Sequence, residues 1–292
     1  MLDINKTLLE EINKYPSEFK VARKVPWSLE RGVPKLTPAS NTYVVFLDLE
    51  TTGLNYKEHE LIELALVKCS ISSTGFISPV DFYSHLQQPS TPINECGDAA
   101  KANGITNVMV EGQTIIPKDI YEFLEGVTYI VSHNATFDRP FFHKYFPNAP
   151  HMKWGCSYKD LPWKSLGQNK CSLDQLLLLD NYTFEVHRAL NDAGALAFLF
   201  QINIELFKDL LHNINQDKYR VLAWEAPFSV KDTLKECGYT WNAPVRNVWS
   251  KDIYKDEIDR ETDMLIALYP NAEDDGEIIK LDDSFKRYLP QE

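Results

Sequence analysis

A short apolar run that ends in two carboxylates constrains this chain more than any other stretch. Residues 43–54 read YVVFLDLETTGL, so that apolar residues are followed by Asp48 and Glu50. Such a run is typical of a strand inside a sheet, and the two-residue period of a strand points both acids to one face. Neighbouring carboxylates repel each other and are costly to desolvate. The pattern predicts either acids that face solvent at a sheet edge, or ligands of a hard cation such as Mg²⁺ or Mn²⁺.

Strand-like and helix-like patterns alternate after this run. We expect strands at 43–49, 61–70, 80–86 and 129–132, and helices at 116–125, 137–146, 171–179 and 188–205. Alternation of this kind is typical of an α/β domain built on a mixed sheet.

The flanking segments have a different character. Residues 1–42 predict an N-terminal helix, at 4–15, and an extended arm that wraps onto the main body at 43–209. Residues 210–270 predict a small α+β module of strands and helices, which is too short to bury much by itself. Residues 271–292 form an acidic tail that we expect to be frayed.

Composition excludes several classes of protein. Thirty basic and forty-two acidic residues leave a net charge of −12, so general affinity for polyanions is not expected. A nucleic-acid partner would need local contacts or metal ions. The five cysteines are scattered without a Cys-x-x-Cys pair, which favours free thiols in a reducing compartment over zinc. No signal peptide or membrane span is recognisable, so we expect a cytoplasmic protein without a membrane partner.

Two later segments add chemically active side chains. Asp138 begins a predicted helix in HNATFD, where an acid also favours the helix dipole, and Asp192 lies on a predicted helix in HRALNDA, preceded by His187. Each acid alone has an ordinary structural explanation. Together with Asp48 and Glu50 they form the set that two-metal phosphodiester hydrolysis requires, in which two cations about 4 Å apart clamp the phosphate. A histidine suits the role of general base near neutral pH.

The motifs DLETTGL, HNATFD and HRALNDA resemble, in this order, the three exonuclease motifs of the DEDDh family. These DnaQ-like 3′–5′ exonucleases have a ribonuclease H-like fold, a mixed central sheet flanked by helices. The resemblance implies that Asp48, Glu50 and Asp192 ligate the principal cation and that Asp48 also ligates the second. It implies that Asp138 acts through metal-bound water and that His187 is the general base.

A finer resemblance concerns substrate and subgroup. WGCSYKDLPWKSLG and WEAPFSVKDTLKECGYTWN resemble a bacterial subgroup with a small C-terminal Gly-Tyr-x-Trp module. Asn103 stands where His or Thr often precedes Gly-Ile-Thr, a departure that we expect to leave catalysis unaffected. The terminal nucleotide is expected near five residues, with Leu54 as an apolar wedge or as a core residue. These residues are Thr51, Thr52, Gly53, Leu54 and Asn134.

The sequence thus predicts a metal-dependent 3′–5′ exonuclease that releases nucleoside 5′-monophosphates from single-stranded DNA. Trimming of RNA or oligoribonucleotides is the related alternative, since an acidic protein suits short substrates. A catalytically idle fold that binds nucleic acid or a repair protein is the alternative from another class. The aromatic residues of the C-terminal module either stack bases or form its core: Trp224, Tyr239, Trp241 and Trp249.

Overall fold

The structure is a computed structural model. It describes residues 11–15, 21–27, 32–168, 171–242, 245, 247–269, 276–282 and 286–289. Of the helix expected at 4–15, residues 11–14 are helical and the earlier part lies outside the described residues.

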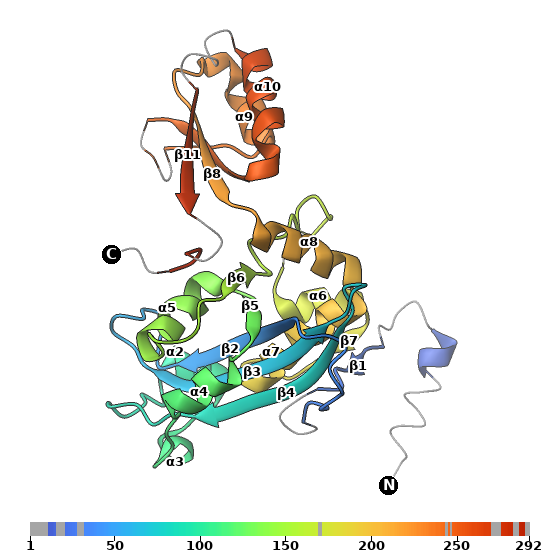
Figure 1. Ribbon diagram of the computed structural model, residues 1–292, viewed down its shortest axis with the longest axis vertical. Coiled ribbons are helices and arrows are strands. Elements are labelled where there is room, and N and C mark those ends of the chain that lie inside the picture. The colour runs from blue at the N-terminus through green and yellow to red at the C-terminus, as the bar shows by residue number, and fades with distance from the viewer. Residues whose placement is uncertain are drawn as a thin grey trace.

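A five-stranded mixed sheet forms the centre of the main body (Figure 1). Its order is β4-β3-β2-β5-β6, in which β2 runs antiparallel to β3, β3 antiparallel to β4, and β5 and β6 parallel to β2. The strands are β2 (Tyr43–Thr51), β3 (Leu61–Ile71), β4 (Ile77–Leu86), β5 (Val127–Ser132) and β6 (Lys153–Cys156). The predicted mixed sheet flanked by helices is confirmed.

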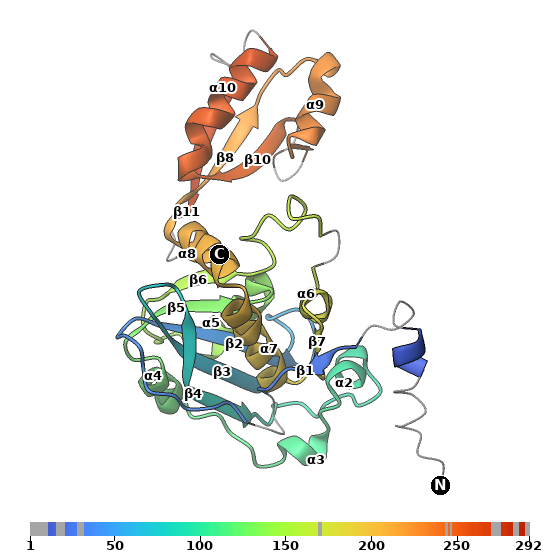
Figure 2. The ribbon, with the colours of Figure 1, turned by 90° about the vertical axis from the view of Figure 1, so that its right-hand side faces the viewer.

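Alternate residues of β2 belong to separate cores on the two faces of the sheet. Phe46 faces the helices α7 (Ala189–Ile202) and α8 (Ile204–Asn215), and its ring packs against Phe200 and Phe207. Leu47 lies in the opposite core, under α4 (Pro117–Phe123) and α5 (Ala135–Tyr145). Figures 1 and 2 show the sheet between these two layers. Asp48 and Glu50 share the face of Phe46, because strand side chains alternate.

Several elements differ from the sequence-based expectation. The helix predicted at 188–205 is two helices, because the chain bends at Asn203, whose side chain bonds the carbonyl of Leu199 at 3.1 Å. Strand β6 was not predicted, since it has four residues and includes Gly155. A side chain at Gly155 would collide with Ile214 of α8, so the glycine permits helix and strand to pack closely. Three further short helices complete the body: α2 (Asp98–Asn103), α3 (Asn107–Val110) and α6 (Leu173–Leu179).

The N-terminal arm contacts the main body. β1 (Arg23–Lys24) pairs in parallel with β7 (Tyr182–Thr183), and the buried ring of Trp27 meets Phe198 of α7 edge-on at 5.7 Å. Among the described residues, no helix is both long enough and apolar enough to cross a membrane.

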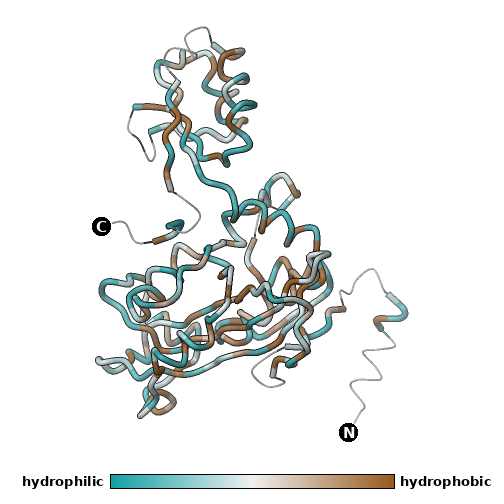
Figure 3. The backbone as a smooth tube through the Cα atoms, in the orientation of Figure 1, coloured by the Kyte–Doolittle hydropathy of each residue, from teal (hydrophilic) through white to brown (hydrophobic). Residues whose placement is uncertain are grey.

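A second, four-stranded sheet follows α8 (Figure 1). Its order is β11-β8-β10-β9, all antiparallel, and the connection into it is hydrophilic in Figure 3. The strands are β8 (Lys218–Ala223), β9 (Thr240–Trp241), β10 (Trp249–Tyr254) and β11 (Gly276–Asp282), covered by α9 (Lys231–Glu236) and α10 (Ile258–Leu268). The expectation of a frayed tail is wrong for β11, because its backbone pairs with β8.

The aromatic residues of this second unit divide between core and surface. Tyr239 and Trp249 are 3% and 7% exposed and belong to its core. Trp241 is 52% exposed. The interpretation of these rings as core residues therefore holds for two of them.

Asp160 joins the main body to the second unit. This buried carboxylate follows β6, and its Oδ1 accepts hydrogen bonds from Lys218 Nζ at 2.8 Å, Tyr254 Oη at 2.9 Å and Tyr288 Oη at 2.6 Å. Its partners come from β8, β10 and the C-terminal segment, so one charge connects segments far apart in the chain.

Candidate metal-binding active site

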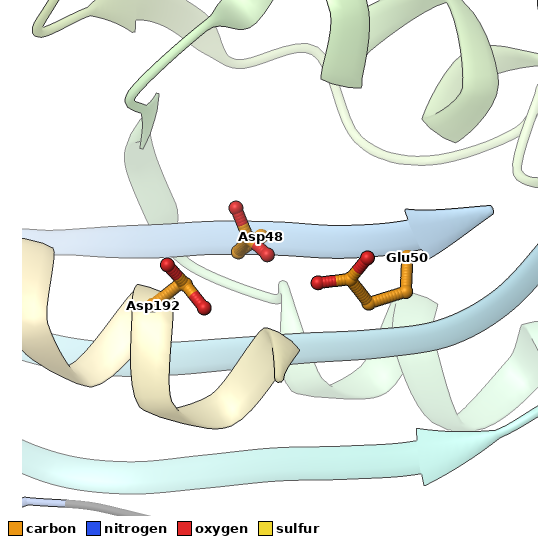
Figure 4. A group of neighbouring side chains, drawn as sticks. All are labelled: Asp48, Glu50 and Asp192. Atoms are coloured by element: carbon orange, nitrogen blue, oxygen red, sulfur yellow. The ribbon is translucent and has the colours of Figure 1, made fainter. Parts of the chain in front are cut away.

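Three carboxylates meet at the end of β2. Asp48 and Glu50 extend from the strand toward Asp192 in the first turn of α7 (Figure 4). One oxygen of each lies within 4.8 Å of the others, and all three side chains are half-buried. Among the described residues, no other group of three or more His, Cys, Asp and Glu side chains is arranged to hold a metal ion. Its donors are all hard oxygen atoms, which suit Mg²⁺ or Mn²⁺.

The electrostatics of the cluster favour a cation. Burial and then the charge of Asp192 raise the pKa of Asp48 well above its ordinary range. The same two causes, in the same order, raise the pKa of Glu50 to about 8. Burial raises the pKa of Asp192 to about 7, although backbone hydrogen bonds from Arg188 and His187 act in the opposite direction. A bound divalent cation would remove the repulsion that adds to these shifts and would compensate the buried charges.

Asp138 and His187 lie at the same cavity without joining the three-carboxylate group. The cavity has a volume of about 480 Å³, and its lining includes Asp48, Glu50, Asp138, His187 and Asp192. Asp138 is buried in the first turn of α5, and burial raises its pKa to about 7. The structure therefore brings together all five residues that the three sequence motifs had singled out.

The cavity wall contains apolar residues that the sequence analysis missed. Phe137, Phe184 and Val186 line it together with Asn134. The only sequence signal for Phe137 and Val186 is that they stand next to Asp138 and His187. Aromatic faces and apolar groups beside a phosphate-binding cluster can stack an unpaired base.

The turn after Glu50 is organised by its own hydrogen bonds. Thr51 Oγ1 donates to the Gly53 carbonyl at 2.7 Å, and Thr52 Oγ1 accepts the Glu60 amide at 3.0 Å. A Cβ on Gly53 would lie 2.5 Å from the His59 ring, so close packing explains the glycine. None of residues 51–54 is among the described residues that line the cavity.

Leu54 and Asn103 differ from simple expectations. The Leu54 side chain is 86% exposed, which rules out the core-packing interpretation. Asn103 is buried, and its Nδ2 donates to Glu50 Oε2 at 3.3 Å while its Oδ1 accepts the Ile105 amide at 2.9 Å. The residue that we expected to leave catalysis unaffected therefore touches a proposed metal ligand.

Comparisons with known proteins place the main body in a family. Residues 45–200 match the family model described as "Exonuclease" (RNase_T). DNA polymerase III subunit epsilon of Aquifex aeolicus is 35% identical over 168 residues, 54% of this chain and 78% of that protein. DNA polymerase III PolC-type of Thermotoga petrophila is 34% identical over 176 residues, 58% of this chain. The matched region spans 12% of that PolC-type protein.

A comparison with solved structures gives a more distant match. It is the nuclease domain of 3′hExo, a DEDDh family member bound to rAMP, with 16% identity and a TM-score of 0.46 over 59% of this chain and 95% of that one. The family model covers more than half of the chain, and the match to subunit epsilon covers more than two thirds of that relative. The chain therefore belongs to the exonuclease family, and its main body is the exonuclease domain.

Proposed function

We propose that this protein is a metal-dependent 3′–5′ exonuclease that removes nucleotides from the 3′ end of single-stranded DNA as nucleoside 5′-monophosphates. The observation that carries the proposal is the group of Asp48, Glu50 and Asp192 oxygens within 4.8 Å of one another. Asp138 and His187 line the same cavity.

The residues fit two divalent cations, Mg²⁺ or Mn²⁺. Carboxylates that burial and repulsion hold at raised pKa values form a donor set that lacks a counter-charge. In this proposal Asp48, Glu50 and Asp192 hold the principal cation, Asp48 also contacts the second, and Asp138 acts through a water molecule. The cations would neutralise phosphate charge and lower the pKa of water.

His187 is the proposed general base. It is exposed at the cavity rim, where its imidazole can accept a proton from the attacking water. The water oxygen forms a bond to phosphorus as the bond from phosphorus to the 3′-oxygen breaks, and the proton passes to an imidazole nitrogen. The 3′-oxygen takes a proton from solvent water, so the products are a shortened strand with a 3′-hydroxyl and a nucleoside 5′-monophosphate.

The proposed substrate contacts lie in the turn after β2 and in the cavity. Leu54 is a largely exposed apolar side chain just beyond β2, and in this proposal it presses against the terminal base, with Thr51, Thr52 and Gly53 shaping its turn. Asn134 lines the cavity near Asp138. DNA is favoured over RNA by the relationship to subunit epsilon of DNA polymerase III.

We also propose a role for each segment of the chain and a cellular location for the protein. Residues 43–209 would carry the chemistry, residues 1–42 would be an arm, and residues 210–270 a small module, whose sheet is completed by β11 from the acidic segment 271–292. All five cysteines are free thiols, which supports a cytoplasmic location.

The test is digestion of a 5′-labelled oligonucleotide with Mg²⁺ or Mn²⁺, with DNA and RNA of one sequence side by side. We expect a ladder that shortens from the 3′ end, faster on single-stranded DNA. Asp48→Ala should abolish it, whereas Asp209→Ala on the exposed side of α8 should not. A ladder that survives Asp48→Ala refutes the proposed site, faster digestion of RNA selects the RNA alternative, and nucleic-acid binding without cleavage selects the binding-only alternative.

A further inference from the structure

An ion pair with a buried carboxylate lies beside the carboxylate cluster. Glu63 on β3 is 2% exposed and is the cross-strand partner of Glu50. Its Oε1 accepts a hydrogen bond from Arg188 Nη2 at 2.8 Å, and its Oε2 accepts one from Arg188 Nε at 3.2 Å. The pair is bidentate, which fixes the relative orientation of guanidinium and carboxylate.

The same carboxylate holds the beginning of α7. Glu63 Oε2 also accepts the backbone N–H of Ala189 at 3.0 Å. The first N–H groups of a helix have no partner within the helix, and Arg188, the N-cap residue, provides no side-chain cap here. A carboxylate at this end is also favoured by the helix dipole. Glu63 therefore fixes both the Arg188 side chain and the start of the helix.

The segment held in this way carries two residues of the site. The Arg188 amide donates to Asp192 Oδ2 at 3.1 Å and so orients that carboxylate. His187, one residue earlier, has a φ of +65°, in the left-handed region that non-glycine residues rarely adopt. Such a conformation persists where surrounding contacts over-determine it, and the contacts of Arg188 lie next to it.

A buried carboxylate at position 63 is energetically unfavourable if its role is structural alone. Its charge adds to the repulsion within the group of Asp48, Glu50 and Asp192. Apolar residues that fill the same volume often stabilise a fold as well as a buried ion pair does. Arg188 brings a positive charge close to Glu50 and offsets part of the negative charge that Glu63 adds.

We infer that Glu63 is a positioning residue, which acts through Arg188 to hold His187 and Asp192 in their working geometry. The inference rests on the proposed exonuclease function. It assigns no direct contact with substrate to Glu63, because the side chain is 2% exposed and is not among the described residues that line the cavity.

The main test is Glu63→Gln, which keeps the size of the side chain but places a neutral amide opposite the guanidinium of Arg188. We expect kcat to fall by about 10- to 100-fold, as for other partners of metal ligands, with KM within about twofold of the wild type. Titration calorimetry with Mn²⁺ alone should show affinity weakened by about 10-fold. Glu261→Gln is the matched control, because Glu261 is equally buried and pairs with Lys251 at 2.6 Å in the second unit. It should lower stability and leave kcat unchanged.

A second variant separates an effect on catalysis from a loss of folding. Arg188→Lys keeps the charge but loses the bidentate geometry, and it should lower kcat by about 10-fold. The double variant Glu63→Gln with Arg188→Gln should be no slower than Glu63→Gln alone, since partners that act as one unit are not additive. The inference is overturned if Glu63→Gln and Arg188→Lys lower the unfolding midpoint but keep kcat and Mn²⁺ affinity near wild type. If the wild type itself leaves DNA intact, the proposed function fails, and the Mn²⁺ titration alone decides the role of Glu63.

Discussion

Replacement of Asp160 by asparagine removes the negative charge that connects the exonuclease domain to the second unit. The side chain of Asp160 is fully buried, and it faces two cations, Lys218 at 2.8 Å and Arg287 at 3.8 Å. Its other oxygen, Oδ2, accepts the Cys156 amide at 2.8 Å. In Asp160→Asn the two cations lose their counter-charge in a largely buried site. The asparagine side chain has one oxygen and one NH2 group, so its NH2 group must face either a cation or the Cys156 N–H.

Removal of one partner from a buried ion pair costs about 3–5 kcal/mol, because the other charge stays desolvated. We expect Asp160→Asn to lower the free energy of unfolding by this amount. The matched control is Asp252→Asn, which breaks the Arg220 pair at 2.7 Å, where the Asp252 side chain is 45% exposed. Exposed pairs contribute about 0–1 kcal/mol.

The pH dependence of this difference follows from the pKa of Asp160. Burial alone would raise the pKa, but the charges of Lys218 and Arg287 and hydrogen bonds from Lys218 and Tyr288 outweigh burial and lower it below its ordinary value of 3.8. A lowered pKa in the folded state stabilises the fold above the unfolded pKa, and this contribution is lost as the pH falls through the folded pKa. The difference between wild type and Asp160→Asn should be constant from about pH 5 to pH 8 and shrink below about pH 4.

Urea unfolding followed by tryptophan fluorescence measures the difference, and limited proteolysis shows whether the second unit separates first. A loss below about 1 kcal/mol for Asp160→Asn, equal to that of Asp252→Asn, would refute the reasoning. A difference that grows as the pH falls would contradict the sign of the pKa shift.

The cluster and its neighbour Asn103 give two further predictions. Burial and repulsion place the pKa of Glu50 at about 8 and those of Asp138 and Asp192 at about 7, so folding without metal should lose stability as the pH rises from about 4 to about 8. Mg²⁺ should therefore raise the melting temperature more at pH 8.5 than at pH 6, by differential scanning fluorimetry, and equal shifts would contradict this. Asn103→Ala removes the hydrogen bond to Glu50 at 3.3 Å, so we expect kcat to fall about 10-fold and stability by about 1 kcal/mol, measured by oligonucleotide digestion and urea unfolding. Unchanged kcat would show that Glu50 is held without it.

Local patterns in the sequence were sufficient to predict the residues that carry the proposed chemistry. The apolar run before Asp48 predicted β2, and the two-residue period of a strand placed Glu50 on the same face. The predicted helix that contains Asp192 was found as α7, with the acid in its first turn. These features depend on neighbours within a few residues, which is the distance over which backbone preferences act.

Contacts between distant segments depended on the tertiary structure. Asn103 lies 53 residues from Glu50, and Glu63 lies 125 residues from Arg188. Strand β6 owes its place to Gly155 under Ile214, and β11 owes its place to the free edge of β8. The four residues of β6 are too few for a clear periodic pattern, and the place of β11 depends on the strand that it pairs with.

The sequence by itself therefore determined the type of fold and the five residues gathered at the cavity, since these follow from periodicity and residue chemistry. Only the tertiary structure decided which side chains support them, such as the Glu63–Arg188 pair beside the cluster, and which charge joins the two units, which is Asp160. The physical reason is that hydrogen bonds and charge pairs form between whichever groups the packed chain brings within about 3 Å, whatever their distance in sequence.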